Sequence, residues 1–132
     1  ISHDTELERY ADALMNRNGA GRALVPIVIV QMNGEAQDKR QLFTLEISKD
    51  TVAIKKEDRI EHEAPYSHKM QICGARGGGD AAGQGLFLAL HPSQVFMLAL
   101  QSPRERNAAI LLTRSMAKAK GFKLEGPKGE DI

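Results

Sequence analysis

The sequence contains no tryptophan and one cysteine, Cys73, among its 132 residues. A single cysteine excludes an internal disulfide framework and fits a reducing compartment. No apolar run approaches the roughly 20 residues that a helix needs to cross a bilayer. The net charge is only +1, so no overall attraction to nucleic acid or to an anionic membrane is expected. A hydrophobic content of 42% is enough for the core of one domain of ordinary size.

Residues that carry chemistry are scarce as well. His62, Glu63 and His68 come nearest to a metal cluster, but the spacing is unusual for zinc, and neighbouring strand residues point to opposite faces. We interpret them as solvated residues at a strand edge. Cys73 has no neighbouring histidine to lower its pKa, so a structural thiol is expected. The sequence favours a protein without catalytic residues, metal or cofactor; a small enzyme or metal protein built on the two histidines is the weaker alternative.

What is present is clearest from Gly85 to Gly121. Leucines alternate with other residues over 86–90, and a second apolar run covers 95–100, so both segments are predicted to be strands. Pro92 lies between them and suits a tight turn. Ser102 can cap a helix, Pro103 fits its first position and Glu105 follows three residues after the cap. A helix is therefore predicted over 103–120, about 27 Å long, ended by Gly121.

Five further strands are predicted from apolar alternation, at 24–32, 41–47, 52–54, 59–63 and 68–75, which makes seven in total. Asn33-Gly34 opens a polar turn after the first of them. Residues 76–85 hold five glycines but lead into a strand, so a flexible hairpin connection is favoured over a phosphate-binding loop. Glycine, proline and charge predict a flexible tail over 121–132.

A leading helix is predicted over 2–18, with Thr5 and Glu8 as a possible capping box. Its apolar stripe is Leu7, Tyr10 and Leu14, too narrow for a helix that is stable alone. We expect it to pack on its own domain near strand 24–32, covering the edge that a proline at position 26 marks. The alternative is that the same three residues bind a partner.

Seven strands, the last two in a tight hairpin, followed by one long helix, resemble the pleckstrin homology (PH) domain. The most specific match is GLFLALHPSQVFMLALQSPRERNAAILLTR, where Ser102, Glu105 and Arg106 occupy the family's helix-opening positions. The family's tryptophan position holds Ala109. The resemblance implies an α+β fold, a seven-stranded antiparallel barrel or sandwich capped by the C-terminal helix. It covers residues 24–120, with 2–18 as an additional helix.

The resemblance also implies a lipid-headgroup pocket between the first two strands. Lys39 and Arg40 close that loop, and a phosphoinositide site would need Lys49 or Lys55 to converge with them. Negative residues in the same loop dilute the charge, and a phosphoinositide requires several cations. We therefore expect weak or no phosphoinositide binding. A headgroup-binding PH domain is the alternative function.

A small PH-like domain with a leading helix and a reduced lipid pocket also resembles the inner membrane complex sub-compartment proteins of apicomplexan parasites. That resemblance implies a non-catalytic scaffold that binds protein partners on the cytoplasmic side of a membrane. It further implies peripheral attachment through acyl chains, myristate and palmitate, carried upstream of Ile1.

Overall fold

The computed structural model describes residues 5–17, 21–76 and 83–127. Two helices and eight strands lie in these ranges. In chain order they are α1 (Thr5–Asn16), β1 (Arg22–Met32), β2 (Glu35–Ala36), β3 (Phe43–Ser48), β4 (Thr51–Lys56), β5 (Arg59–Pro65), β6 (Gln71–Ala75), β7 (Gly85–His91), β8 (Gln94–Leu100) and α2 (Pro103–Ala119). None of the described helices is long and apolar enough to span a membrane.

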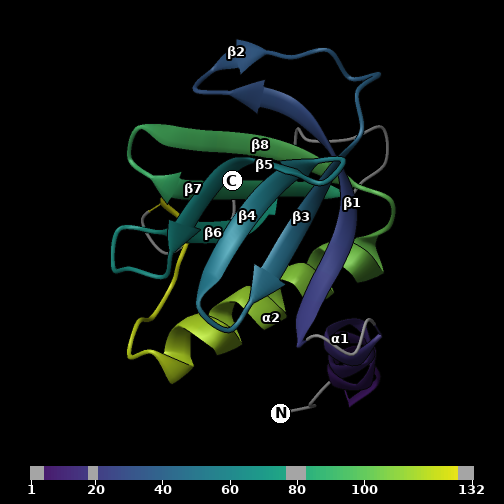
Figure 1. Ribbon diagram of the computed structural model, residues 1–132, viewed down its shortest axis with the longest axis vertical. Helices are drawn as coiled ribbons and strands as arrows, with labels where there is room; N and C mark the ends of the chain where they lie inside the picture. The colour runs from purple at the N-terminus through teal and green to yellow at the C-terminus, as the bar shows by residue number, and fades with distance from the viewer. Residues whose placement is uncertain (1–4, 18–20, 77–82, 128–132) are drawn as a thin grey trace.

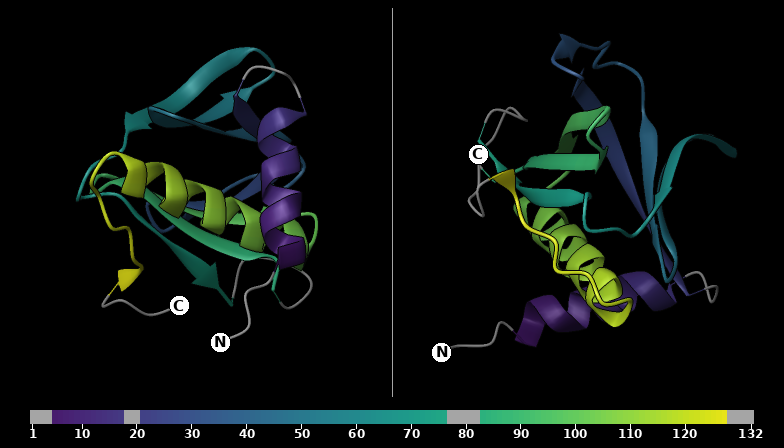
Figure 2. Two further views of the ribbon diagram at one scale, coloured as in Figure 1. Left: turned by 90° about the horizontal axis from the view of Figure 1, so that it is seen from below. Right: turned by 90° about the vertical axis from the view of Figure 1, so that its left-hand side faces the viewer.

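The strands form one antiparallel sheet in the order β5-β4-β3-β1-β8-β7-β6, with the short β2 pairing only with β1. β1 joins the two halves, because its first part, from Arg22 to Ile27, pairs with β3 and its later part, from Ile27 to Met32, pairs with β8. The sheet thus wraps around a core, and α2 closes one end (Figures 1 and 2). The predicted antiparallel α+β architecture is confirmed.

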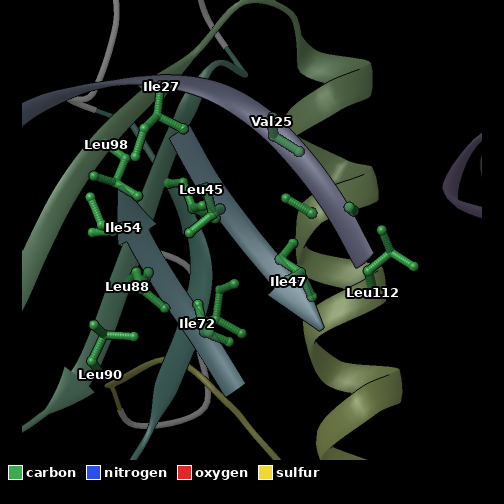
Figure 3. Close-up of a cluster of buried hydrophobic side chains, with 14 of the residues drawn as sticks. Val25, Ile27, Leu45, Ile47, Ile54, Ile72, Leu88, Leu90, Leu98 and Leu112 are labelled. Carbon is green, nitrogen blue, oxygen red and sulfur yellow. The ribbon is translucent and has the colours of Figure 1, made fainter. Parts of the chain in front are cut away.

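The core consists of the inward-facing aliphatic residues of both halves, together with the inner face of α2 (Figure 3). Val25, Leu45, Ile54, Leu88 and Leu98 are each no more than 1% exposed. Along β1 and β8 they alternate with more exposed residues, which is the pattern that buries one face of a sheet, whereas β6 and β7 are buried on both faces. The alternation read from the sequence therefore placed the inner face correctly.

The α2 helix begins and ends as the sequence predicts. The Ser102 hydroxyl accepts a hydrogen bond of 3.1 Å from the backbone N–H of Glu105, and Pro103 occupies the first turn. At the other end, the N–H groups of Gly121 and Phe122 donate to the carbonyls of Lys118 and Ala117. Gly121 has φ +93°, the left-handed conformation that this pair of helix-ending hydrogen bonds requires. Small buried residues on the inner face let the helix approach the sheet closely: Ala108, Ala109, Thr113 and Ala117.

The leading helix packs on its own domain, as expected. α1 lies against α2 and the first part of β1 (Figure 2). The prediction that it covers an edge strand of the sheet is wrong, because β1 lies between β3 and β8 in the strand order. Pro26 is accommodated because pairing with β8 begins only at Ile27, so β1 lacks a neighbour on that side at Pro26. The possible cap is displaced too, since Thr5 is already the first helical residue.

Residues 121–127, here called the trailing segment, differ from the expected flexible tail. Leu124 is only 3% exposed and belongs to the core, and Phe122 packs against it. The backbone N–H of Ile72 in β6 donates to the carbonyl of Glu125 at 3.3 Å. The segment is thus held along β6; the rest of the expected tail lies outside the described residues, as do 77–82 of the glycine-rich connection.

Candidate interaction surfaces

The four cations expected to bind lipid do not converge. Lys39 and Arg40 lie in the loop before β3, and Lys55 lies beside the start of that strand through the Thr44–Lys55 pairing. Lys49 lies in the turn after β3, at its opposite end, roughly 20 Å away. The predicted residues therefore divide between two ends of the domain. We call them the hairpin end, residues 33–42 and 57–58, and the helix-covered end, where both helices lie (Figure 1).

Carboxylates pair with three cations at or beside the hairpin end: Arg40, Lys55 and Arg59. Arg40 holds Asp38 through two side-chain bonds of 3.0 and 3.2 Å, and this partner lowers the pKa of Asp38 below its ordinary value. Lys55 lies 3.4 Å from the Glu46 carboxylate, and Arg59 lies 3.1 Å from Glu61. A phosphorylated headgroup would have to compete with these carboxylates.

The two most exposed large apolar side chains of the described residues lie at or beside the hairpin end: Leu42, 68% exposed, belongs to it, and Ile60, 50% exposed, follows it in β5. Its turn is precisely shaped, because Asn33 has φ +52° and Gly34 has φ +83°, as the Asn-Gly pair predicts. The Asn33 amide donates to the carbonyl of Ser93 at 3.0 Å and accepts from the N–H of Val95 at 2.9 Å. This turn is therefore tied to the β7–β8 turn, a link that the sequence pattern does not predict.

The helix-covered end carries a different set of charges. Its lysines come from the β3–β4 turn, the loop before β6, the end of α2 and the trailing segment: Lys49, Lys69, Lys118, Lys120 and Lys123. Two of them form ion pairs, Lys120 with Asp50 and Lys123 with Glu125. The Lys120 ammonium lowers the pKa of Asp50. Sequence reasoning singled out only Lys49 as a ligand, since the others are brought together by tertiary packing.

Tyr66 ties the loop before β6 to the same end. Its hydroxyl donates to the carbonyl of Ser48 at 2.7 Å, and the residue is 5% exposed. Burial, with a smaller contribution from the Asp50 charge, raises the pKa of this phenol. The tyrosine therefore stays protonated at neutral pH, and its hydroxyl holds the loop against the β3–β4 turn.

A groove of about 580 Å³ runs between the second half of α2 and the trailing segment. Its walls combine cations with apolar side chains: Arg114, Lys118, Phe122, Lys123 and Leu124, together with Gly121 and Glu125. The Arg114 guanidinium donates to the carbonyl of Ile72 at 3.0 Å, which links α2 to the edge of β6. Two apolar residues after the helix-ending glycine are the sequence signal that would have indicated packing here.

The three residues expected to bind a partner through α1 make contacts within the domain. Leu14 is 4% exposed and lies in the core. The Tyr10 ring has the guanidinium carbon of Arg104 at 4.1 Å from its centre, which joins α1 to the start of α2. Leu7 is half-buried and lines a shallow hollow with Ile110 of α2. Partner binding through this stripe stays a prediction.

Side chains that could bind a metal or act in catalysis are dispersed. Across residues 5–17, 21–76 and 83–127, no three His, Cys, Asp or Glu residues gather as a metal would need. His62 differs from its expected solvated position, because its ring lies edge-on to the buried Phe96 with 4.9 Å between ring centres. Cys73 is buried in a second apolar cluster on the other face of the sheet, beside Phe87.

Comparison with known families identifies the domain. Residues 23–129 match the family model for the PH domain of plant-specific actin-binding protein. The chain belongs to this family. The match spans the sheet, α2 and the trailing segment, so the ordered segment after α2 lies within the matched region.

The curated relatives are plant proteins from Arabidopsis thaliana. Stomatal closure-related actin-binding protein 1 is 34% identical over 92% of this chain, and protein 2 is 35% identical over 76%. The chain spans only between a fifth and a quarter of the length of these relatives. Among solved structures, the N-terminal PH domain of human ARAP2 aligns with a TM-score of 0.50 and 13% identity, covering 75% of this chain and 79% of that one. At that identity the likeness supports the fold alone.

These comparisons confirm the resemblance to PH domains and do not support the apicomplexan one. The matching proteins are plant actin-binding proteins. The inner membrane complex interpretation rested on features of architecture, a leading helix and a reduced lipid pocket, which unrelated PH-like domains can share. A shared architecture does not establish a shared function. The expected location at an apicomplexan inner membrane complex is therefore withdrawn.

Proposed function

We propose that this domain is a non-catalytic PH-type interaction module of a plant actin-binding protein, and that its partner is a protein rather than a phosphoinositide bound at the hairpin end. The observation that carries the proposal is the compensation of Arg40, Lys55 and Arg59 by carboxylates within 3.5 Å. The dispersed histidines and the buried Cys73 supply no nucleophile or metal set for catalysis.

Liposome co-sedimentation tests this function. We expect no selective pelleting with phosphoinositide-containing vesicles, and no change in Lys39→Ala/Arg40→Ala. Salt-sensitive pelleting that disappears in this double variant would favour the headgroup-binding alternative and overturn the proposal. Co-sedimentation with actin filaments in the same buffers would determine whether the activity in the relatives' names extends to this quarter of their length.

A second candidate function is weak binding to an anionic membrane on its cytoplasmic face, through the lysines of the helix-covered end. The pairing of Lys120 with Asp50, next to Lys49, and the shared groove of Lys118 and Lys123 favour it, because each lysine near an anionic surface adds about 1 kcal/mol. The expected acyl anchor rested on the apicomplexan resemblance alone, so it has no support from the plant family.

A further inference from the structure

The outer edge of β6 is occupied by groups that do not belong to a strand. β6 is the last strand on the sheet path, so its outer side has no β-strand neighbour among the described residues. The N–H of Ile72 donates to the carbonyl of Glu125, and the carbonyl of Ile72 accepts from Arg114. An edge strand presents such groups to any extended chain that can pair with them.

The trailing segment imitates the partner that this edge would accept. Leu124 is 3% exposed, whereas the flanking side chains of Lys123 and Glu125 are 88% and 54% exposed. This in-and-out alternation is that of an extended strand. The hydrogen bond that joins it to Ile72 is 3.3 Å long, beyond the usual 2.9–3.0 Å. The backbone bond from the edge to this segment is therefore long, and the buried Leu124 supplies the closer contact.

The wall opposite β6 belongs to α2 and remains when the trailing segment leaves. Arg114 and Lys118 project from this helix into the groove of about 580 Å³. Departure of the trailing segment also removes Lys123 and Glu125, which pair with each other. The charge left at the groove is positive, so a peptide with carboxylate side chains complements it.

We propose that the edge of β6 and the facing surface of α2 form a docking site for an extended acidic peptide of a partner protein, which replaces residues 122–125. The peptide adds a strand to β6 through Ile72, places an apolar side chain where Leu124 lies, and directs a carboxylate to Arg114 and Lys118. This is recognition by strand addition. The inference deepens the proposed function, because it assigns a surface and a peptide class to the protein-binding module.

The test uses a fluorescein-labelled peptide with the sequence of residues 121–127 and Lys123→Glu, which makes it acidic. Binding to the 132-residue chain is measured by anisotropy. In the unaltered chain the trailing segment competes, which lowers apparent affinity by the fraction of open sites. The protein variant Leu124→Ala weakens that competitor and should bind at least about tenfold more tightly. The protein variant Leu42→Ala, which makes the same substitution at an exposed residue outside the groove, is the matched control and should bind as the unaltered chain does.

Three results would overturn the proposal: equal affinity of the unaltered chain and Leu124→Ala, unchanged affinity in Lys118→Glu, or equal binding of a peptide with serine at the Leu124 position. Self-association of Leu124→Ala on sedimentation would also overturn it, because a second copy would then fill the groove. If Leu124→Ala does not fold, an NMR titration of the unaltered chain decides. The amide of Ile72 should shift, and shifts elsewhere only, or none, would count against the site.

The two proposals fail in different ways. Absence of peptide binding, with liposomes also unbound, would remove the β6 site but leave a protein-binding module with another surface. Liposome binding that depends on Lys39 and Arg40 would remove the protein-binding function itself, whatever the peptide does.

Discussion

The two ends of the barrel differ in how their charges and apolar groups are held. At the hairpin end, cations pair with carboxylates of their own loops, as Arg40 does with Asp38, and Leu42 stands 68% exposed. At the helix-covered end, Lys123 and Glu125 also pair within one segment, but Lys120 of the α2 terminus joins a different element by pairing with Asp50 of the β3–β4 turn. Leu124, in the trailing segment, is buried there.

The difference shows which end can change in evolution without loss of the fold. Local pairs and exposed side chains at the hairpin end contribute to the loop alone, so that loop can lose a lipid pocket at little cost. The contacts of the helix-covered end connect α1, α2, the trailing segment, the β3–β4 turn and the loop before β6. Substitutions there should therefore alter stability and binding together.

The largest contrast is expected between two leucines. Leu124→Ala should lower the free energy of unfolding by about 2–4 kcal/mol, because it leaves a cavity in the core. Leu42→Ala, at the hairpin end, should change it by less than about 0.5 kcal/mol. Urea unfolding followed by circular dichroism measures both. Equal effects of the two substitutions would show that the trailing segment is not part of the cooperative fold.

A smaller loss is expected from the leading helix. Leu7→Ala/Leu14→Ala should lower the unfolding free energy by about 1–2 kcal/mol and Tm by several degrees. The loss is limited because α1 can undock without unfolding the barrel. Asp12→Ala/Asn16→Ala, on exposed positions of the same helix, is the control and should leave Tm nearly unchanged. Unchanged stability in the leucine variant, with loss of self-association or partner binding, would make α1 an interaction element.

These contrasts also mark how far the sequence predicts the molecule. The strands and α2 were predictable because their signals are local: alternation for the sheet, Ser102 and Gly121 for the helix ends. The packing of residues 121–127 was not predictable, because the segment is rich in glycine, proline and charge. The burial of its two apolar residues depends on α2 and β6, which are distant in the sequence. The interior position of β1 was missed for a related reason. Pro26 does mark a missing neighbour, but only over one part of a strand that changes partners.

The candidate sites divide in the same way. Lys39 and Arg40 were placed correctly in one loop, since they are adjacent in sequence. Whether Lys49 or Lys55 joins them is a matter of strand ends and tertiary pairs, and the structure puts Lys49 at the other end and Lys55 against Glu46. Charge compensation by a residue nine positions away leaves no local signature.

An intermediate effect should distinguish the two ends in binding to anionic vesicles. Lys49→Glu/Lys69→Glu should reduce any binding to vesicles rich in phosphatidylserine by about tenfold or more, since each lysine contributes about 1 kcal/mol near such a surface. Lys39→Glu/Arg40→Glu makes the same change of charge at the hairpin end and should reduce it less than threefold. Pelleting assays at two salt concentrations measure both. The reverse order of effects would assign the anion-binding surface to the hairpin end.

The smallest contrast concerns two aspartates whose pKa values lie below the ordinary 3.8. A lowered folded-state pKa stabilises the fold above the unfolded pKa, and this stabilisation is lost as pH falls through the folded value. Asp50→Asn should therefore lower Tm by about 1–2 °C at pH 7, because it frees α2 from the β3–β4 turn, and the gap should narrow as the pH falls below the ordinary aspartate pKa of 3.8. Asp38→Asn should have no measurable effect at either pH, because Arg40 is only two residues away and the pair constrains one loop. Calorimetry of the two variants beside the parent chain at pH 7 and pH 3 isolates each carboxylate, since all other titrating groups are shared. An equal shift in both variants would mean that the ion pairs of the two ends contribute alike, and the distinction between loop-bound and element-joining charges would fail.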